Sequence, residues 1–260
     1  MHLFHGLSGD VNSEYMRRIA ARMTARGHEV WTANHRGCGE GGELASRPYH
    51  SGRTEDLQAV LATSREEAPD RVHIVVGFSL SGNAALLYAA RRLEPMPHGI
   101  VAVNPPVDLH RASVDIGRGW NRLYEMRFMW RLRQVVRERE RSGRSPRHYE
   151  IPLTMSLPEF DDLLTAPECG FENALDYYAR CSALPHLKDV AAPSVIVTSA
   201  DDPFVDPVAY EGAALSDDIF LHVEPSGGHV GYLSARRGRV QRWLDDAVVH
   251  YVDELARLQA

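Results

Sequence analysis

The sequence has few cysteines, no excess of positive charge and no long hydrophobic run. Its three cysteines are widely spaced and odd in number, which argues against a disulfide framework and predicts a reducing, cytoplasmic compartment. Acidic residues outnumber basic ones by 35 to 29, so the chain is a poor candidate for binding nucleic acid. No apolar run approaches the roughly 18 residues of a membrane-spanning helix, and the first residues lack the pattern of a signal peptide.

Internal repeats and Gly/Ser-rich linkers are also absent, and the 260 residues suit one large domain, 1–260. Short apolar segments that are typical of strands alternate with amphipathic segments that are typical of helices. This alternation predicts an α/β fold with a mostly parallel, doubly wound sheet. The predicted strands are 1–5, 28–34, 72–77, 99–104, 194–200 and 219–223, and the predicted helices are 13–26, 54–67, 81–93 and 237–258.

One segment, 105–189, interrupts this alternation between the fourth and fifth predicted strands. It follows the carboxyl end of a strand, where open α/β sheets bind ligands, so we expect a helical cap inserted over a crevice. Glutamates interrupt the arginines of its long helical stretch, 120–141, which favours a solvated helix over a phosphate or membrane-surface site. Its large apolar side chains are expected to line an acyl pocket or to pack on the sheet; they are Trp120, Tyr124, Met126, Phe128, Met129 and Trp130.

The most informative segment is 77–82, Gly-Phe-Ser-Leu-Ser-Gly, which joins a predicted strand to a predicted helix. Small residues around Ser79 allow the sharp turn of a nucleophile elbow, which lifts a serine hydroxyl clear of the strand ends. The usual motif has glycine where this chain has Ser81, a small residue that still permits helix and strand to approach closely. The alternative is an ordinary glycine-rich turn, so the elbow alone does not establish a nucleophile.

A serine nucleophile needs a base, and the base needs a carboxylate that orients it. The segment 201–203, Asp-Asp-Pro, follows the fifth predicted strand, and the segment 227–229, Gly-Gly-His, follows the sixth. Both segments are therefore expected at the edge of the sheet that carries the elbow. We predict His229 as the base and Asp202 as the acid, with Asp201 as the alternative acid.

Two backbone N–H groups are the predicted donors to a tetrahedral oxyanion. One belongs to Leu80, the residue after the nucleophile, and the other to Leu7, in the glycine-containing loop after the first predicted strand. His5 is expected to support this loop. A metal pair formed by His2 and His5 would have no carboxylate partner nearby, and no metal site is predicted.

Three further polar residues are predicted to have structural roles. Cys38 lies in a tight glycine-containing loop, and we expect it to be a small packing residue rather than a reactive thiol. His50 precedes a predicted helix and is expected to make a loop hydrogen bond or to pack beneath the site. Asp206 is expected to cap the helix that opens at Pro207.

In combination, these motifs resemble the α/β-hydrolase superfamily, and more closely its YheT-like esterase branch. The resemblance covers essentially the whole chain and is carried by the segments 5–7, 34–38, 49–52, 55–56, 77–83, 160–162, 176–178, 201–204 and 227–231. It implies the α/β-hydrolase fold, a triad of Ser79, Asp202 and His229, and no cofactor. The implied activity is hydrolysis of carboxylic esters, often short-chain esters or acylglycerols.

Other functions remain open at this stage. A thioesterase or an amidase would use the same triad, because the fold serves many reactions. A ligand-binding protein without activity, on a degenerate hydrolase scaffold, is the alternative outside enzymes. Dehalogenase chemistry is disfavoured because its nucleophile would be an aspartate where this chain has Ser79.

The start of the chain departs from the family. Relatives generally have two further strands before the His5-Gly6 loop, and this sequence begins directly with the strand that leads into it. In the family topology the missing strands cover the predicted strand 28–34, which would become a bare sheet edge. We therefore expect either a truncated start or a protein that covers this edge by self-association.

Overall fold

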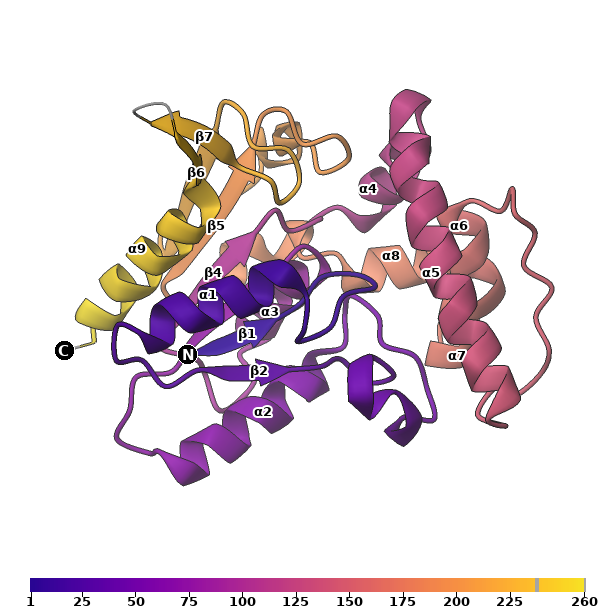
Figure 1. The fold of residues 1–260 in the computed structure, drawn as a ribbon, viewed down its shortest axis with the longest axis horizontal. Helices are drawn as coiled ribbons and strands as arrows, with labels where there is room; N and C mark the ends of the chain where they lie inside the picture. Colours follow the sequence, from indigo (N-terminus) through magenta and orange to yellow (C-terminus); the bar gives the residue numbers. More distant parts are fainter. Residues whose placement is uncertain (237–238, 260) are drawn as a thin grey trace.

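A six-stranded parallel sheet forms the centre of the molecule (Figure 1). The computed structural model describes residues 1–236 and 239–259. The strands run in the order β2-β1-β3-β4-β5-β6. They are β1 (His2–Phe4), β2 (Trp31–Ala33), β3 (Ile74–Phe78), β4 (Gly99–Val103), β5 (Ser194–Ser199) and β6 (Ile219–Glu224). All six predicted strands are confirmed.

The central strands are buried on both faces, which explains why they are continuous apolar runs. Every residue of β3, β4 and β5 is buried. In register, Val76 of β3 pairs with Val101 of β4, and Val101 pairs with Val195 of β5. Strand β2 lies at one edge of the sheet, and its neighbour in the described part of the chain is β1.

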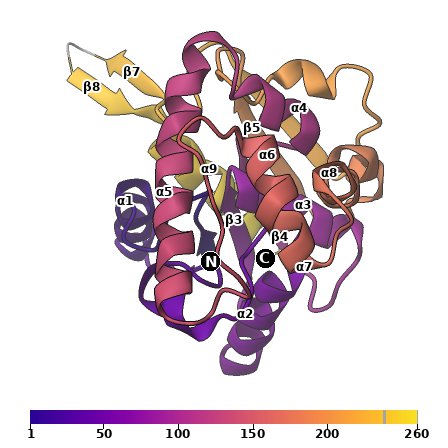
Figure 2. The same ribbon diagram turned by 90° about the vertical axis from the view of Figure 1, so that its right-hand side faces the viewer.

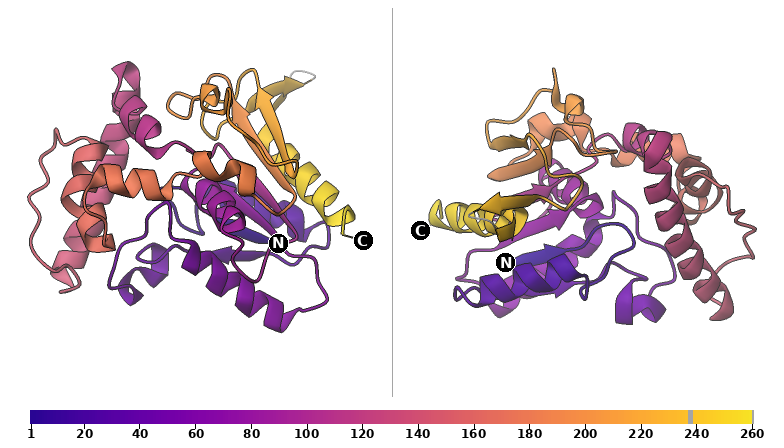
Figure 3. Two further views of the ribbon diagram at one scale, coloured as in Figure 1. Left: turned by 180° about the vertical axis from the view of Figure 1, so that it is seen from behind. Right: turned by 45° about the horizontal axis from the view of Figure 1, so that its top comes forward.

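Helices cover both faces of the sheet, as the doubly wound prediction requires (Figures 1 and 3). On one face lie α1 (Glu14–Thr24) and α9 (Trp243–Arg257), which bury their apolar stripes against β3, β4 and β5. On the other face lie α2 (Thr54–Glu67) and α3 (Leu80–Ala90), packed with residues from the same strands. Within the described ranges, no helix has both the length and the apolar character needed to cross a membrane.

The chain between β4 and β5 forms a separate helical layer at one end of the molecule, opposite both termini (Figures 1 and 2). It has its own apolar cluster, which includes Met129, Val136 and Phe160. Its elements are α4 (Leu109–Asp115), η2 (Gly119–Asn121), α5 (Arg122–Arg141), α6 (Leu157–Phe160), a π-helical turn η3 (Asp161–Thr165), α7 (Ala166–Cys169), α8 (Ala174–Cys181) and η4 (Leu184–Asp189). The last of these returns to the main core, where Leu187 packs in the same cluster as α3.

The prediction that α5 is a solvated arginine helix is wrong for part of its length. Arg133 and Arg139 are only 5% and 3% exposed, and the Arg139 guanidinium lies 2.6 Å from Glu168. One face of α5 packs on the other helices of its layer, so arginines on that face are buried. A buried charge of this kind requires a partner, which α7 supplies for Arg139.

The expected positions of the aromatic and methionine residues in 120–130 are only partly correct. Phe128 and Trp130 line a cavity, and Met129 packs in the apolar cluster of the helical layer. In contrast, Trp120 is 86% exposed and Met126 is 55% exposed. Neither lines the cavity or packs on the sheet: Met126 lies on the outward face of α5, and Trp120 lies in η2, before α5 begins.

The predicted helix 237–258 begins later than expected. Residues 237–238 lie outside the described residues, but an antiparallel hairpin of β7 (Leu233–Arg236) and β8 (Arg239–Arg242) replaces the first part of that helix. Val240, which the helical spacing assigns to a buried stripe, is 74% exposed. A short apolar pattern does not by itself distinguish helix from strand, and Figure 2 shows that this hairpin projects from the body of the molecule.

Two further short helices complete the loops around the carboxyl edge of the sheet. The 3₁₀ helix η1 (Gly39–Leu44) follows β2, and η5 (Pro207–Tyr210) follows β5. The side chain of Asp206 accepts a hydrogen bond from Val208 N–H at 2.9 Å at the start of η5. The predicted role of Asp206 as a helix cap is therefore confirmed.

Candidate active site

Ser79 occupies a sharp and strained turn between β3 and α3. Its φ of 52° and ψ of −120° are rare for a residue with a side chain. Its N–H donates to Val103 O at 2.7 Å, and its carbonyl accepts from Gly82 N–H at 2.8 Å. A Cβ at Gly77 would lie 2.5 Å from Ser81 O, so the crossing of strand and helix requires glycine there. The geometry is that of a nucleophile elbow.

The side chains of Ser79, His229 and Asp202 form one hydrogen-bonded row. His229 Nε2 lies 2.8 Å from Ser79 Oγ, and His229 Nδ1 lies 2.7 Å from Asp202 Oδ2. The Asp202 side chain is fully buried and that of His229 is 11% exposed. The ring of Phe204 packs against the imidazole with 4.3 Å between centroids, which restricts its motion. A proton on Nδ1 satisfies the carboxylate and leaves Nε2 free to accept from serine.

Asp202 is held in place by groups that the sequence analysis did not identify. Its Oδ1 accepts from the N–H groups of Phe204 and Val205 at 3.1 and 2.9 Å. Its Oδ2 also accepts from the side-chain amide of Asn104, whose own Oδ1 accepts from the Tyr232 hydroxyl. Asn104 follows β4 and has a φ of 43°. Its position after a strand next to β3 was the one signal available in the sequence.

Asp201 has a different role from its neighbour. Its Oδ1 accepts from the N–H groups of Gly227 and Gly228 at 2.7 and 2.8 Å. These backbone hydrogen bonds lower the pKa of the Asp201 carboxyl from its ordinary value. Asp201 thus holds the loop that carries His229, whereas Asp202 contacts the imidazole itself.

Ser81, the departure from the usual elbow motif, ties α3 to the end of β1. Its hydroxyl donates to His5 O, and His35 Nε2 lies 2.6 Å from the same hydroxyl oxygen. Burial lowers the pKa of His35 to about 3, so this ring is neutral at physiological pH and donates one N–H. A serine at this position therefore adds a connection between helix and loop that glycine would lack.

The loop after β1 comes close to Ser79. A Cβ at Gly6 would lie 3.2 Å from Ser79 Cβ, so glycine permits the approach. His5 supports the loop, as expected: its Nδ1 lies 2.9 Å from Gly6 O and its Nε2 accepts from His35 N–H at 3.2 Å. The N–H groups of Leu7 and Leu80 have no acceptor within hydrogen-bond distance in the described part of the chain, which leaves both available to a ligand.

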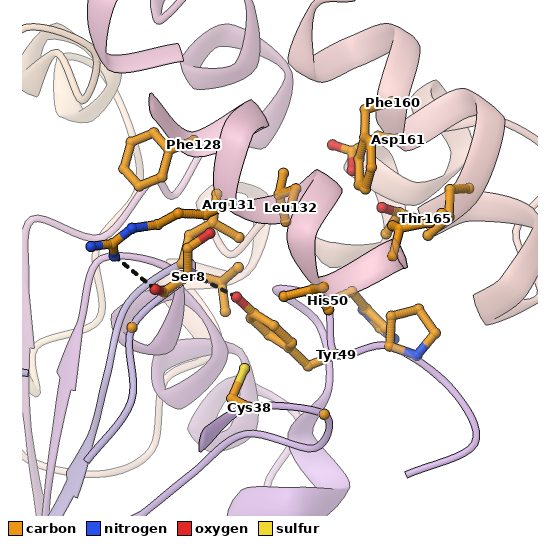
Figure 4. Close-up of a pocket in the computed structure, with 18 of the residues that line it drawn as sticks. Ser8, Cys38, Tyr49, His50, Phe128, Arg131, Leu132, Phe160, Asp161 and Thr165 are labelled. Carbon is orange, nitrogen blue, oxygen red and sulfur yellow. Dashed lines mark hydrogen bonds between the residues drawn. The ribbon is translucent and has the colours of Figure 1, made fainter. Parts of the chain in front are cut away.

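A cavity of about 810 Å³ lies between the carboxyl edge of the sheet and the helical layer. Ser79, Leu80 and Leu7 line it on the sheet side. Figure 4 shows Phe128, Arg131 and Leu132 on one wall, with Tyr49 and Cys38 facing them. Its apolar lining includes Leu109, Ile116, Leu157, Phe160, Leu164 and Phe204. Both volume and lining suit a small molecule with an apolar part.

Two other titratable residues that line the cavity, Cys38 and His50, are poorly suited to act as a nucleophile or as an acid. Burial raises the pKa of the Cys38 thiol to about 12, so Cys38 is not a thiolate at neutral pH. Burial lowers the pKa of His50 to about 3, and its Nδ1 accepts from Gly52 N–H at 3.2 Å.

His2 contacts His73 at 3.1 Å rather than His5. Among the described residues, no group of three His, Cys, Asp or Glu side chains is arranged to hold a metal ion.

Asp161, from the π-helical turn η3, is a buried carboxyl that makes stability depend on pH. Burial raises its pKa to about 6, against the opposing effect of hydrogen bonds from Thr165 and Tyr178. The folded state therefore binds a proton more tightly than the unfolded state, so this contribution to stability is complete below about pH 4 and is lost as pH rises through about 6. The predicted loss is about 3 kcal/mol at most.

Replacement of Asp161 by asparagine should remove this pH dependence. Asparagine stays neutral and its Oδ1 can accept the hydrogen bond that the Tyr178 hydroxyl now donates at 2.8 Å. We expect the melting temperature of the variant, relative to the native chain, to rise between pH 4.5 and pH 7 when both are measured by calorimetry. Parallel pH profiles for the two proteins would contradict the assignment.

Comparison with known proteins identifies related sequences and folds. A family model described as "Alpha/beta hydrolase family" matches residues 3–242. The chain is 31% identical over 252 residues to YheT of Escherichia coli (strain K12), which is named provisionally as an esterase; the match covers 95% of this chain and 74% of YheT. It is 26% identical over 261 residues to the monoacylglycerol lipase of Saccharomyces cerevisiae, covering 96% of this chain and 58% of the lipase.

A solved structure supports the fold. The esterase Pf2001 of Pyrococcus furiosus superposes with a TM-score of 0.60, covering 98% of this chain and 81% of the esterase. At 17% sequence identity, this likeness concerns the arrangement of strands and helices and not the substrate.

Proposed function

Because the chain belongs to the alpha/beta hydrolase family, we propose that it hydrolyses carboxylic esters with Ser79 as nucleophile, His229 as base and Asp202 as orienting acid. The observation that carries this proposal is the hydrogen-bonded row of these three side chains, with contacts of 2.8 and 2.7 Å. The names of the relatives, an esterase and a monoacylglycerol lipase, support an ester as the substrate.

In the first half of the reaction, the ester acylates the enzyme. Ser79 Oγ attacks the carbonyl carbon while His229 Nε2 takes the hydroxyl proton. The carbonyl oxygen becomes an oxyanion that accepts hydrogen bonds from the N–H groups of Leu7 and Leu80. Asp202 stabilises the imidazolium formed at His229. The tetrahedral intermediate then collapses, the C–O bond of the ester breaks, and the alcohol leaves with the proton from His229.

In the second half, water releases the acid. His229 Nε2 takes a proton from a water molecule, whose oxygen attacks the acyl carbon on Ser79. The same two N–H groups hold the second oxyanion. On collapse, the bond to Ser79 Oγ breaks, the serine recovers its proton from His229, and the carboxylic acid leaves.

The helical layer supplies the binding site in this proposal. We assign 1–260 to one hydrolase domain and the segment 105–189 to a cap whose side chains line the cavity opposite Ser79. The apolar lining suits the acyl chain of short-chain esters or acylglycerols. The cap also shields the reacting carbonyl from bulk water, which strengthens the hydrogen bonds to the oxyanion.

A series of p-nitrophenyl esters with acyl chains of two to eight carbons tests the substrate class. The purified chain should hydrolyse these esters, and KM should fall as the acyl chain lengthens. Each methylene buried in an apolar cavity contributes about 0.8 kcal/mol, which corresponds to up to roughly fourfold in KM. The measurement is the initial rate of p-nitrophenol release.

Matched acyl thioesters and p-nitroanilides distinguish the other reactions that this triad supports. We expect kcat/KM to be highest for the oxygen esters. Preference for a thioester or an anilide of the same acyl chain would replace the ester assignment. Binding of acyl compounds with no turnover of any of them would replace it with a ligand-binding function.

Two expectations from the sequence stay predictions. Self-association would occur through the free edge of β2, since β1 is its neighbour in the described sheet and an uncovered edge can pair with another chain. The cytoplasmic location predicted from the sequence is the second of them.

A further inference from the structure

The turn that carries Leu7 is strained. Gly9 N–H donates to Gly6 O at 3.1 Å, which closes a β-turn over Leu7 and Ser8. Ser8 has a φ of 58°, whereas Leu7 does not have a positive φ. A positive φ at the third position alone is the pattern of a type II turn, in which glycine is favoured and any side chain is unfavourable. The chain nevertheless has serine at this position.

The hydroxyl of Ser8 does not account for the choice of this conformation. Ser8 Oγ is buried and has no hydrogen-bond partner in the described part of the chain. The conformation must therefore be held by groups that contact the backbone of Ser8. Without them, rotation of the Leu7–Ser8 peptide would convert the turn to type I and return Ser8 to a negative φ.

Two side chains hold the backbone of Ser8, one on each side (Figure 4). The Tyr49 hydroxyl accepts from Ser8 N–H at 2.7 Å, and Arg131 Nη1 of α5 donates to Ser8 O at 2.9 Å. Rotation of the Leu7–Ser8 peptide would turn Ser8 N–H away and break the bond to Tyr49. Among the described residues, Arg131 forms no ion pair with a carboxylate, and its guanidinium makes its hydrogen bond to Ser8 O instead.

Tyr49 is itself rigidly placed. Its ring stacks on that of His35 with 5.1 Å between centroids and an interplanar angle of 6°. His35 in turn lies 3.1 Å from His5 O and 2.6 Å from Ser81 Oγ. Burial raises the pKa of the Tyr49 hydroxyl well above its ordinary value, so the hydroxyl stays neutral. Tyr49 and His35 thus connect the turn 6–9 to the elbow that carries Ser79.

We propose that Tyr49 and Arg131 are positioning residues that keep the turn 6–9 in its strained form and so hold Leu7, whose N–H is the proposed oxyanion donor, in place beside Ser79. This inference rests on the proposed function, because it assigns a role to the Leu7 donor. Neither side chain needs to touch the substrate. Since Arg131 belongs to α5, its bond to Ser8 O also makes the turn 6–9 depend on the position of the cap.

We call the two bonds that Tyr49 and Arg131 make to the backbone of Ser8 the clamp. The variant Tyr49→Phe removes the first of these bonds and retains the stacking of the ring on His35. We expect kcat for a p-nitrophenyl ester to fall about tenfold with KM within twofold of the native value, because the lost bond holds backbone and not substrate. Hydrogen exchange of peptides that cover residues 6–9 should become faster. Tyr88→Phe is the matched control. Tyr88 belongs to α3, and its hydroxyl donates to Pro95 O at 3.1 Å, so its loss should leave both readouts unchanged.

The decisive variant is the double replacement Tyr49→Phe with Ser8→Gly. Glycine prefers the positive φ and removes no hydrogen bond of the native chain, so the turn no longer needs its clamp. We expect kcat of the double variant to return to within threefold of the native value. Ser8→Gly alone should stay within the same range. A merely structural loss caused by Tyr49→Phe would not be repaired at residue 8.

Arg131 is tested by a pair of variants. Arg131→Met should lower kcat about fivefold, and Arg131→Lys, which keeps a cationic donor, should recover most of that loss. Equal losses in the two variants would remove Arg131 from the proposal.

The clamp and the esterase activity are tested by different outcomes. If the native chain hydrolyses esters but Tyr49→Phe keeps native kcat, or if Ser8→Gly does not restore it, the clamp is wrong and the esterase assignment stands. If the native chain hydrolyses no ester, the proposed function is wrong. Unchanged hydrogen exchange at residues 6–9 in Tyr49→Phe overturns the clamp independently of activity.

Discussion

Replacement of Ser79 by alanine is expected to lower kcat for ester hydrolysis by about 10⁶-fold. The hydroxyl oxygen is the atom that forms the acyl bond in the proposed reaction, and its hydrogen-bond partner among the described residues is His229 Nε2 at 2.8 Å. The backbone bonds of the elbow, from Ser79 N–H to Val103 O and from Gly82 N–H to Ser79 O, do not involve the hydroxyl. The melting temperature should therefore stay close to that of the native protein.

A fluorophosphonate probe tests the nucleophilic role of Ser79 without a substrate. The native chain should be labelled covalently at Ser79, and the alanine variant should not be labelled. Ser194→Ala is the matched control, since Ser194 Oγ donates to Ala192 O at 2.7 Å at the opposite end of the sheet; it should be labelled like the native chain. Turnover by the Ser79 variant at the native rate would exclude the acyl-enzyme route.

Replacement of Asp202 by asparagine is expected to lower kcat by about 10⁴-fold. The Oδ1 position could still accept from Phe204 and Val205 N–H, but the new amide would then donate toward His229 Nδ1. This contact favours the tautomer with its proton on Nε2, which faces Ser79 and can no longer accept the serine proton. The side-chain amide of Asn104, which now donates to Asp202 Oδ2, would also face the N–H donors of the new amide.

The neighbouring variant Asp201→Asn is the matched control for this effect. An asparagine oxygen can still accept from Gly227 and Gly228 N–H, so the loop keeps its anchor and kcat should stay within a fewfold of the native value. The measurement is kcat for one ester with both variants, with circular dichroism to verify folding. A larger loss in Asp201→Asn than in Asp202→Asn would reverse the two roles.

The order of strands and helices could be predicted because local patterns determine it. Runs such as 72–77 and 194–200 are apolar without interruption, which identifies strands buried on both faces. The predictions were wrong where the sequence pattern was ambiguous, or where the burial of a charged side chain depended on an ion-pair partner elsewhere in the chain. Val240 fits a helical stripe but lies in the hairpin β7–β8, and Arg139 fits a solvated helix but is buried beside Glu168.

The candidate site was predictable in its segments and less so in its contacts. Ser79, the pair Asp201 and Asp202, and His229 each follow a predicted strand, and parallel strands bring such positions to one edge. Asp202 was predicted as the acid, but Asp201 stayed the alternative, because one residue of strand boundary decides which carboxylate faces the imidazole. The roles of Tyr49 and Arg131 carried no local signal, and Asn104 offered only its position at the end of the predicted strand 99–104.

The amino-acid sequence alone determined the turn at Ser79, because the crossing of β3 and α3 admits little more than glycine at Gly77, and that requirement is local. It also determined the parallel sheet and therefore the edge at which the polar loops gather. Only the tertiary structure decided which atoms meet across long separations, such as Arg131 with Ser8 or Asn104 with Asp202. These contacts are specific in direction and distance, and they depend on the packing of the whole chain rather than on any pattern along it.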